Sequence, residues 1–273
     1  MDLPTPSPSY FQRFGGIARL YGHQGLEAFA HAHVAVIGIG GVGSWVAEAL
    51  ARSGVGTLSL MDLDDICLTN TNRQIHALTE TIGAPKIRVM ASRLRSINPD
   101  VVVHERSAFY REAIAEAFFE TPFGFIVDAI DSVRNKAHLL ATARRLTRPV
   151  VSIGGAGGRI DPTRIKTDDL SRSSGDRLLM LVRKKLRSAY HFPRVGRGRF
   201  RIPCVYSDEP PRFPAADGSV CSLRGPAAPS GLTCDTGLGS ATHITASMGF
   251  FAAGIVLRAL AKDCGQPPGP PPG

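Results

Sequence analysis

A glycine-rich turn between an apolar strand and a helix constrains the fold of this chain more than any other feature. The apolar run at residues 33–37 is rich in β-branched side chains, and Gly38-x-Gly40-x-x-Gly43 follows it directly. Residues 42–52 then carry apolar side chains at helical spacing. A strand, glycine turn and helix in this order are typical of Rossmann-like α/β sheets, because glycine lets the chain turn back tightly on the strand.

Strand and helix patterns continue to alternate as far as residue 153. We expect further strands at 57–61, 101–103, 123–127 and 149–153, and further helices at 86–97 and 135–146. Strands that are apolar throughout are buried on both faces, which is typical of parallel sheets covered by helices. The sequence therefore predicts an α/β fold with a Rossmann-like, doubly wound, mainly parallel sheet.

The pattern changes after residue 158. A hairpin is expected at 159–168, a helix at 177–190, a loop-rich stretch at 205–226 and a final helix at 240–262. We interpret residues 10–158 as a core and 159–263 as a C-terminal extension of the same domain, with mixed strands and helices. The Pro-rich ends, 1–9 and 264–273, lack apolar periodicity and are expected to be disordered.

Charge and cysteine content suggest the partners and the compartment. The net charge of +9 favours a polyanionic partner, because neutralised phosphates release counterions. The five cysteines are odd in number and form no CxxC pair, which argues against a disulfide framework and against structural zinc. A reducing, cytoplasmic setting fits this content. Residues 241–257 carry no formal charge, so membrane association through them is the alternative, but their strongly apolar part suits a buried helix better.

The glycine turn and the next strand predict a nucleotide site. Main-chain N–H groups of Gly38, Gly40, Gly41 and Gly43 can approach phosphates at a helix N-terminus. Asp62 ends the following strand, where a carboxylate can accept hydrogen bonds from ribose hydroxyls.

Three charged residues favour ATP over a dinucleotide. Arg73 and Lys86 supply cations suited to a triphosphate, and Asp131, after the fourth strand, can hold Mg²⁺. Each also has an ordinary structural interpretation. Arg73 can be a surface cation, Lys86 a residue at a helix start, and Asp131 the N-cap of the helix that follows it.

Several segments resemble the adenylation core of the E1-like activating enzymes, a superfamily that includes the molybdopterin-synthase and thiamine-biosynthesis adenylyltransferases. The segments that carry the resemblance are Gly38–Ser44, Leu60–Asp64, Asn70–Gln74, Pro85-Lys86 and Asp128–Asp131. The chain is most similar to one branch, the tRNA threonylcarbamoyladenosine dehydratases, through residues 13–22, 69–78, 154–163 and Cys204–Ser207.

The resemblance implies a reaction and roles for the matching residues. ATP would adenylate the threonyl carboxylate of N6-threonylcarbamoyladenosine at position 37 of a tRNA, and the carbamoyl group would then close a ring and release AMP. The glycine turn and Asp62 would hold the nucleotide, and Asp131 would hold Mg²⁺. The other implied nucleotide-binding residues are Asp64, Asn70, Arg73, Gln74 and Lys86.

Relatives of this type also imply partners. A homodimer is expected, with an arginine, Arg13 or else Arg19, entering the ATP site of the second subunit. Some relatives use a cysteine to accept an acyl group, and Cys234 is the candidate here, although the favoured interpretation is a buried structural thiol. A sulfur-acceptor or cysteine desulfurase partner is a further implication.

A basic stretch at 183–201 is the expected tRNA contact. It holds eight basic residues and no acidic one, and Tyr190, Phe192 and Phe200 interleave with the charges. Such a pattern suits RNA phosphates and unpaired bases, whereas the alternative is a solvated helix face and a flexible loop. The predicted contacts are Arg183, Lys184, Lys185, Arg187, Arg197 and Arg199.

Three other functions are compatible with parts of the sequence. The first is an adenylyltransferase that activates the C-terminus of a ubiquitin-like sulfur carrier. The second is an NAD(P)-dependent oxidoreductase built on the same glycine turn. The third is a tRNA-binding scaffold without catalysis.

Overall fold

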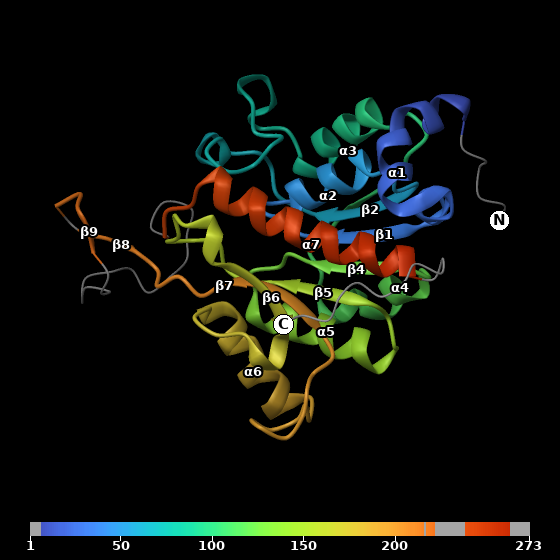
Figure 1. The fold of residues 1–273 in the computed structure, drawn as a ribbon. Coiled ribbons are helices and arrows are strands. Elements are labelled where there is room, and N and C mark those ends of the chain that lie inside the picture. Colours follow the sequence, from blue (N-terminus) through green and yellow to red (C-terminus); the bar gives the residue numbers. More distant parts are fainter. Residues whose placement is uncertain (1–6, 216, 222–237, 263–273) are drawn as a thin grey trace.

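The computed structural model describes residues 7–215, 217–221 and 238–262, and these form a sheet covered by helices on both faces (Figure 1). The seven strands of the sheet lie in the order β3-β2-β1-β4-β5-β7-β6. Their bounds are β1 His33–Ile37, β2 Thr57–Asp62, β3 Val102–Ser107, β4 Phe125–Asp128, β5 Val150–Ile153, β6 Ile165–Asp169 and β7 Pro203–Ser207. All neighbouring strands pair in parallel except β6, which runs antiparallel to β7.

Two hydrophobic clusters fill the spaces between the sheet and its helices. On one face lie α1 (Pro8–His31), α2 (Gly43–Arg52), α3 (Lys86–Ile97) and α7 (Thr242–Lys262). On the other lie α4 (Ala115–Glu120), α5 (Val133–Arg145) and α6 (Arg177–Ala189) (Figure 1). The predicted doubly wound sheet is confirmed, and the apolar strand runs are buried because helices cover both faces.

β1 lies between β2 and β4, so the direction in which the chain adds strands reverses at β1 and β4. In open α/β sheets, ligands bind outside the carboxyl ends of the strands at such a reversal. The glycine turn leaves β1 at that point. The fold thus places the predicted nucleotide loop where ligands of this architecture bind.

The expected hairpin at 159–168 is wrong. Residues 162–164 form a short 3-10 helix, and β6 pairs with the distant β7 instead. The loop-rich interpretation of 205–226 is corrected in part, because β7 is a buried strand of the main sheet and a small ribbon, β8 (Phe213–Pro214) with β9 (Val220–Cys221), follows. The errors over β6 and β7 have one cause, since strand pairing between segments far apart in the chain leaves no local signal.

The N-terminal helix α1 also extends beyond what the sequence analysis expected. Ser7 caps it by accepting a hydrogen bond from the amide of Tyr10, and Pro8 and Ser9 form its first turn. These three residues lie in the stretch 1–9 that we expected to be disordered, so that expectation is wrong for them. The rest of that stretch and the C-terminal tail, 264–273, lie outside the described residues.

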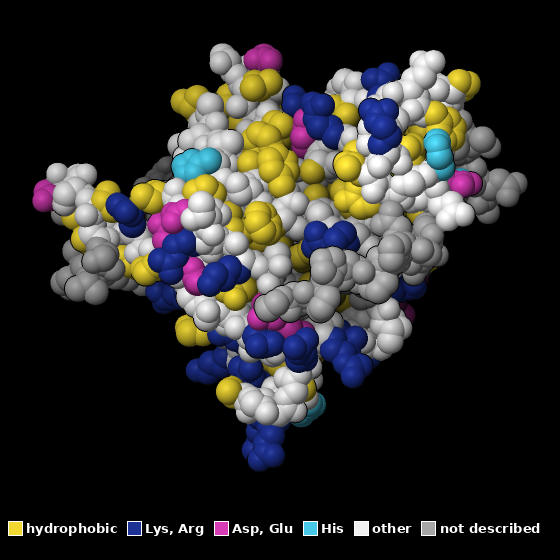
Figure 2. Space-filling model, viewed as in Figure 1, with side chains coloured by type: hydrophobic (Ala, Val, Ile, Leu, Met, Phe, Trp, Pro, Cys, Tyr) yellow, Lys and Arg dark blue, Asp and Glu magenta, His cyan; other side chains and the backbone are white. Residues whose placement is uncertain are grey.

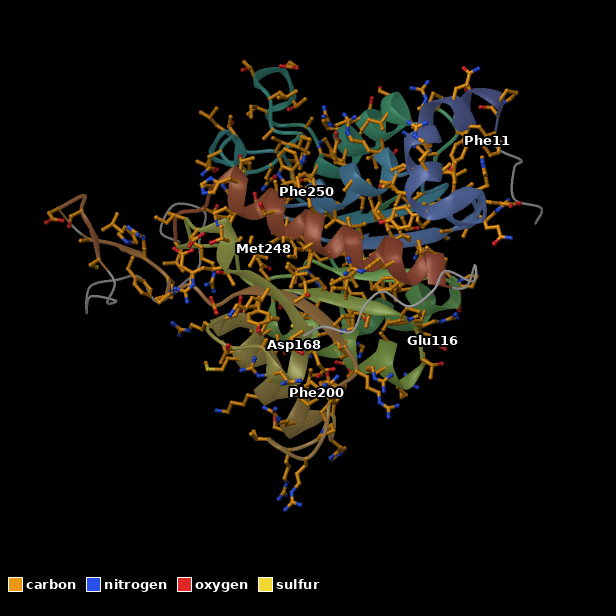
Figure 3. The ribbon with its side chains drawn as sticks, viewed as in Figure 1. Phe11, Glu116, Asp168, Phe200, Met248 and Phe250 are labelled. Atoms are coloured by element: carbon orange, nitrogen blue, oxygen red, sulfur yellow. The ribbon has the colours of Figure 1, made fainter. Side chains whose placement is uncertain are left out.

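α7 contains the one stretch in the described part of the chain that is long and apolar enough to cross a membrane. In the structure, α7 runs along the sheet and packs against α2, β5 and β7. Ile244, Met248, Ala252 and Val256 are fully buried in the core, whereas Phe250 is half-exposed on the outer face (Figure 3). The apolar character of α7 is therefore explained by core packing.

Candidate nucleotide site

The glycine turn packs against the end of β4 as closely as backbone allows. Gly38 has a left-handed φ of 90°, and a Cβ placed on it would lie 2.8 Å from the carbonyl oxygen of Ala129. A Cβ on Gly43 would fall 1.8 Å from the carbonyl oxygen of Gly38. Glycine is therefore required at both positions, and the turn leads directly into the N-terminus of α2.

Asp62 ends β2 beside this turn and is 6% exposed. One carboxylate oxygen accepts a 2.7 Å hydrogen bond from the amide of Ile39, and the other accepts a 2.9 Å bond from the amide of Asp64. Each carboxylate oxygen can accept a second hydrogen bond, so the side chain is fixed in place yet still able to bind a ribose hydroxyl.

Arg73 and Gln74 lie against the same turn. Side-chain carbons of Arg73 stand 3.5 Å from where a Cβ of Gly41 would be, and Nε2 of Gln74 stands 3.9 Å from where a Cβ of Gly40 would be. The Oε1 atom of Gln74 is buried and has no hydrogen-bond partner within the described structure. A buried polar atom without a partner marks a place where a polar ligand is expected.

Asn70 shapes the loop that carries Arg73. It is buried, and its Oδ1 accepts a 3.1 Å hydrogen bond from the amide of Cys67, which closes a short 3-10 turn. The amides of Arg73 and Gln74 both donate to the carbonyl of Asn70. Asn70 therefore sets the position of both neighbours.

Lys86 is buried and paired. Lys86 is the first residue of α3, so its interpretation as a residue at a helix start is confirmed. Its side chain is nevertheless only 8% exposed. Its Nζ lies 2.8 Å from Oδ2 of Asp64, and its amide donates to the Asp64 carbonyl. An ammonium has three donors, so this pair orients Lys86 while leaving hydrogen bonds for phosphate oxygens.

Asp131 is exposed in the turn between β4 and α5. The N-cap of α5 is Ser132, so the interpretation of Asp131 as a helix cap is wrong. Beneath this turn, Asp128 and Lys136 form a fully buried ion pair of 2.9 Å. Lys136 also donates to the carbonyls of Asp128 and Ile130, and Ser152 donates to the Asp128 carboxylate.

This buried pair supports the turn and was not predicted from the sequence. Burial raises the pKa of the Asp128 carboxyl, while the Lys136 ammonium acts in the opposite direction. Removing one member of such a pair typically costs about 3–5 kcal/mol, because the other charge is left uncompensated. The available signal was Lys136 itself, a lysine beside Ala137 and Leu140 on the inward face of a helix.

α7 anchors the Arg73 loop from above. The carbonyl oxygen of Arg73 accepts two 3.1 Å hydrogen bonds, one from Oγ1 of Thr245 and one from Nε1 of Trp45. Thr242 donates to the carbonyl of Asn72, whose side chain donates to the carbonyl of Ser240. The contacts with α7 were not predicted from the sequence, because they join segments far apart in the chain.

Arg13 does not reach this site within its own chain. The start of α1 binds at the opposite ends of the strands. There, Tyr10 donates a hydrogen bond to the carbonyl of Gly54, and Ser7 donates one to Asp100. Gly54 and Asp100 precede β2 and β3, so they mark the amino ends of the strands. Figure 3 shows Phe11 on the outer side of α1, and Arg13 is exposed on the same helix.

The predicted tRNA contacts differ in their availability. Lys184, Lys185, Arg197 and Arg199 are exposed. Arg183 donates to Ser173, and Arg187 donates to the carbonyl of Pro193 and stacks on Phe200, so both are held by the protein itself.

The aromatic side chains in the basic stretch do not suit base stacking. Phe200 is 2% exposed, and Tyr190 and Phe192 pack against the core beside it. Phe200 is therefore withdrawn from solvent, and Tyr190 and Phe192 are partly covered by their core contacts.

No three His, Cys, Asp or Glu side chains in the described part of the chain gather as a metal site. Cys67 and Cys204 are free thiols. Cys234 lies outside the described residues.

Comparisons with known proteins agree with this geometry. Residues 15–267 match the ThiF family. The chain is 45% identical to the tRNA threonylcarbamoyladenosine dehydratase of Escherichia coli K12, over 93% of this chain and 95% of that protein. It is 41% identical to the Bacillus subtilis dehydratase, over 70% and 72%.

A solved structure supports the same grouping. The Escherichia coli dehydratase TcdA in complex with ATP superposes with a TM-score of 0.84 at 41% identity, covering 96% of this chain and 98% of that one. The Escherichia coli ThiS adenylyltransferase, by contrast, is 33% identical over 49% of this chain. The chain belongs to the ThiF family, within its branch of tRNA threonylcarbamoyladenosine dehydratases.

Proposed function

We propose that this protein uses ATP to dehydrate N6-threonylcarbamoyladenosine at position 37 of tRNA. In the first step, a threonyl carboxylate oxygen attacks the α-phosphorus of ATP, and pyrophosphate leaves. In the second, the carbamoyl group attacks the activated carbonyl carbon and loses a proton, and AMP leaves as the ring closes. The net change in the nucleoside is the loss of one water.

Each step has a physical reason. A carboxylate oxygen is a poor leaving group, whereas AMP is a good one, so adenylation opens a path for the second attack. The attacking carbamoyl group is tethered to the same nucleoside, which gives it a high effective concentration. An intramolecular closure needs no thioester, so the chemistry does not require Cys234.

Residues at the carboxyl edge of the sheet supply the binding and the charge. Asp62 and the glycine turn hold the ribose and phosphates, with the phosphates near the N-terminus of α2. Arg73 and Lys86 offset the charge that develops at the α-phosphorus. The observation that carries the proposal is the convergence of Gly40, Gly41, Arg73 and Gln74 at the end of β1.

Asp131 fits a magnesium ion bound mainly through ATP. Mg²⁺ is commonly held by one or two carboxylates together with substrate phosphates and water. Asp131 is an exposed carboxylate with no hydrogen bond or ion pair within the described structure, at the edge where the phosphates would lie. When bound, the ion would neutralise phosphate charge.

A sulfur-carrier adenylyltransferase is the weaker alternative. Relatives of that kind match about half of this chain, whereas the Escherichia coli dehydratase matches 93% of it. A cytoplasmic homodimer is part of the proposal. The half-exposed Phe250 and Phe251 on the outer face of α7 are compatible with burial between subunits.

Nucleoside mass spectrometry tests the function directly. tRNA carrying threonylcarbamoyladenosine is incubated with protein, ATP and Mg²⁺, and we expect the nucleoside to lose one water. Lys86→Gln is expected to lower turnover by about 10²–10³-fold, as for loss of one positioned donor. Arg88→Gln, two residues along the same helix and exposed, is the matched control. Pyrophosphate exchange stimulated by a Gly-Gly-ended carrier protein, and not by this tRNA, would contradict the proposal.

A further inference from the structure

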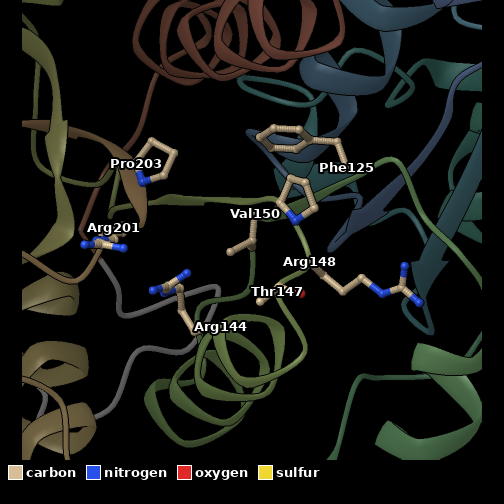
Figure 4. A pocket seen from close by; sticks show the side chains of 8 residues that line it. Phe125, Arg144, Thr147, Arg148, Val150, Arg201 and Pro203 are labelled. Atoms are coloured by element: carbon tan, nitrogen blue, oxygen red, sulfur yellow. The ribbon is translucent and has the colours of Figure 1, made fainter. Parts of the chain in front are cut away.

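Two adjoining hollows lie at the amino ends of the parallel strands, whereas the nucleotide site lies at their carboxyl ends. Their volumes are about 210 and 500 Å³. Both are lined by Phe125, Arg201 and Pro203, which stand at or beside the amino ends of β4 and β7 (Figure 4). We call them together the arginine hollow. Its other polar or charged lining residues are Arg144, Thr147, Arg148, Thr167, Asp168, Asp169 and Arg258.

Arginines from four segments line the arginine hollow. Figure 4 shows Arg144 and Arg201 near one another, whereas the side chain of Arg148 extends away from them. Arg144 lies in the last turn of α5, Arg148 before β5, Arg201 before β7, and Arg258 on α7. None of their side chains makes a hydrogen bond or ion pair to another described residue. Guanidinium groups without a partner among the described residues are available for external anions.

The two aspartates of the hollow do not neutralise these arginines. The carboxylate of Asp169 accepts hydrogen bonds from the amides of Ser171, Phe200 and Ile202. Asp168 lies 3.6 Å from Arg172, which is outside the hollow. Both carboxylates are therefore already engaged with other groups.

The backbone of the hollow is unusual at two of its polar positions. Thr147 has a φ of 53° and Arg201 a φ of 56°, and both are non-glycine residues in the left-handed region. His191 is the third such residue in the described part of the chain. Such conformations are uncommon, persist where the surroundings enforce them, and cluster at functional sites.

The hollow continues the exposed part of the basic stretch. Arg201 is its last residue, and the exposed Arg197 and Arg199 precede it. Lysine and arginine gather over the lower part of the face in Figure 2, where Figure 1 places α6 and the loop after it. Guanidinium groups spread over several segments suit a chain of phosphates better than one small anion.

α7 sets the distance between the hollow and the nucleotide site. Thr245 contacts the Arg73 loop and Arg258 lines the hollow, and the two residues lie thirteen positions apart on the helix. At 1.5 Å per residue this is about 20 Å. About six stacked nucleotides cover that length at ~3.4 Å each.

We propose that the arginine hollow binds the RNA phosphodiester backbone of the tRNA, several nucleotides away from the modified base. This inference rests on the proposed function for the identity of the RNA. The hollow would hold the tRNA body while position 37 occupies the nucleotide site at the carboxyl ends of the strands. Its contribution is to affinity and placement, since phosphate contacts carry no base sequence.

Salt-dependent tRNA binding tests the assignment. We compare the double variant Arg144→Gln/Arg201→Gln with the control Arg88→Gln/Arg111→Gln, which removes the same charge from exposed positions elsewhere. The slope of log affinity against log salt is expected to fall by about 0.7–0.9 for each phosphate that is no longer neutralised, hence by about 1.5 for the first variant. The KM for tRNA should rise about tenfold or more, with the KM for ATP unchanged. The control should match the wild type.

Two further measurements keep the outcomes separate. Arg144→Lys/Arg201→Lys keeps the charge and should recover most of the salt slope, which excludes misfolding as the cause. Equal slopes for the hollow variant and the wild type, or equal reductions in both glutamine doubles, would overturn the inference. Dehydration is followed in the same samples. If the wild type dehydrates the nucleoside but the hollow variant binds tRNA as the wild type does, only the inference about the hollow is rejected. If the wild type does not dehydrate the nucleoside, the proposed function is rejected.

Discussion

Asp62, Lys86 and Gln74 are polar residues that the fold buries beside one glycine turn. Their chemical identity predicts much of the site, because a glycine turn after a strand and a carboxylate after the next strand are local signals. The pairing of Lys86 with Asp64 was not predicted. This ion pair depends on how the loop between β2 and α3 folds back. The residues of that loop do not indicate its path.

His76 gives a prediction at this scale. Both of its ring nitrogens are buried without a hydrogen-bond partner in the described structure. Burial, with Lys86 and Arg93 nearby, lowers the pKa of His76 from 6.5 to about 4. The unfolded chain therefore takes up a proton before the folded one does. This contribution to stability is complete above the unfolded pKa of 6.5 and is lost as the pH falls towards 4.

We expect the free energy of unfolding to fall over this window. In His76→Gln, the dependence on pH should be shallower than in the wild type by up to about 1.4 kcal/mol per pH unit. Urea unfolding at steps between about pH 6.5 and pH 4.5 measures both slopes. His31→Gln, at the exposed end of α1, is the control and should keep the wild-type slope. Identical slopes for His76→Gln and the wild type would contradict the assignment.

Among the elements, α7 has two structural roles. Its inner face fills the core above the sheet, and its first turns hold the loop that carries Arg73. The helix itself was predictable from a long apolar stretch with suitable ends. Its contact with the nucleotide loop was not, because nothing in residues 240–262 or 69–78 specifies that they meet. β6 and β7 were missed or misassigned for the same reason, since their pairing joins distant segments.

Thr245→Val tests the second role of α7. The change keeps the shape of the side chain but removes one of the two hydrogen bonds to the Arg73 carbonyl. Loss of one such bond costs about 1 kcal/mol, so we expect the KM for ATP to rise about fivefold. Steady-state kinetics measures this, and a thermal melt monitors folding. Ser247→Ala removes only a bond to the same helix and should leave the KM for ATP unchanged. Equal KM values in all three proteins would count against this role.

In the molecule as a whole, the nucleotide site lies at the carboxyl ends of the strands and the start of α1 lies at their amino ends. The role of Arg13 in an ATP site, which the family resemblance implies, therefore requires a second copy of the chain. Sequence analysis predicted the doubly wound fold well, because buried strands alternating with helices permit few other topologies. Which surface meets another molecule depends on exposed side chains, and these leave a weaker pattern.

Mixed dimers test this arrangement. Arg13→Ala and Lys86→Gln are each expected to be nearly inactive alone. After the two are mixed and allowed to exchange subunits, half of the dimers contain one of each, and one of their two sites is intact. Activity should then recover to about a quarter of the wild-type value per site. An Arg19→Ala and Lys86→Gln mixture is the parallel test of the other arginine. No recovery in either mixture would exclude both arginines from the partner's site.

The position of α7 in the chain has a consequence for biosynthesis. Thr245, which fastens the Arg73 loop, and many of the buried side chains that close the core belong to this late helix. The ribosome releases α7 after every nucleotide-binding motif, so a nascent chain carries those motifs before it can lock them in place. A chain cut short before residue 242 would expose Val46, Leu50 and other core side chains. We expect such incomplete products to be cleaved by proteases more readily than the full chain.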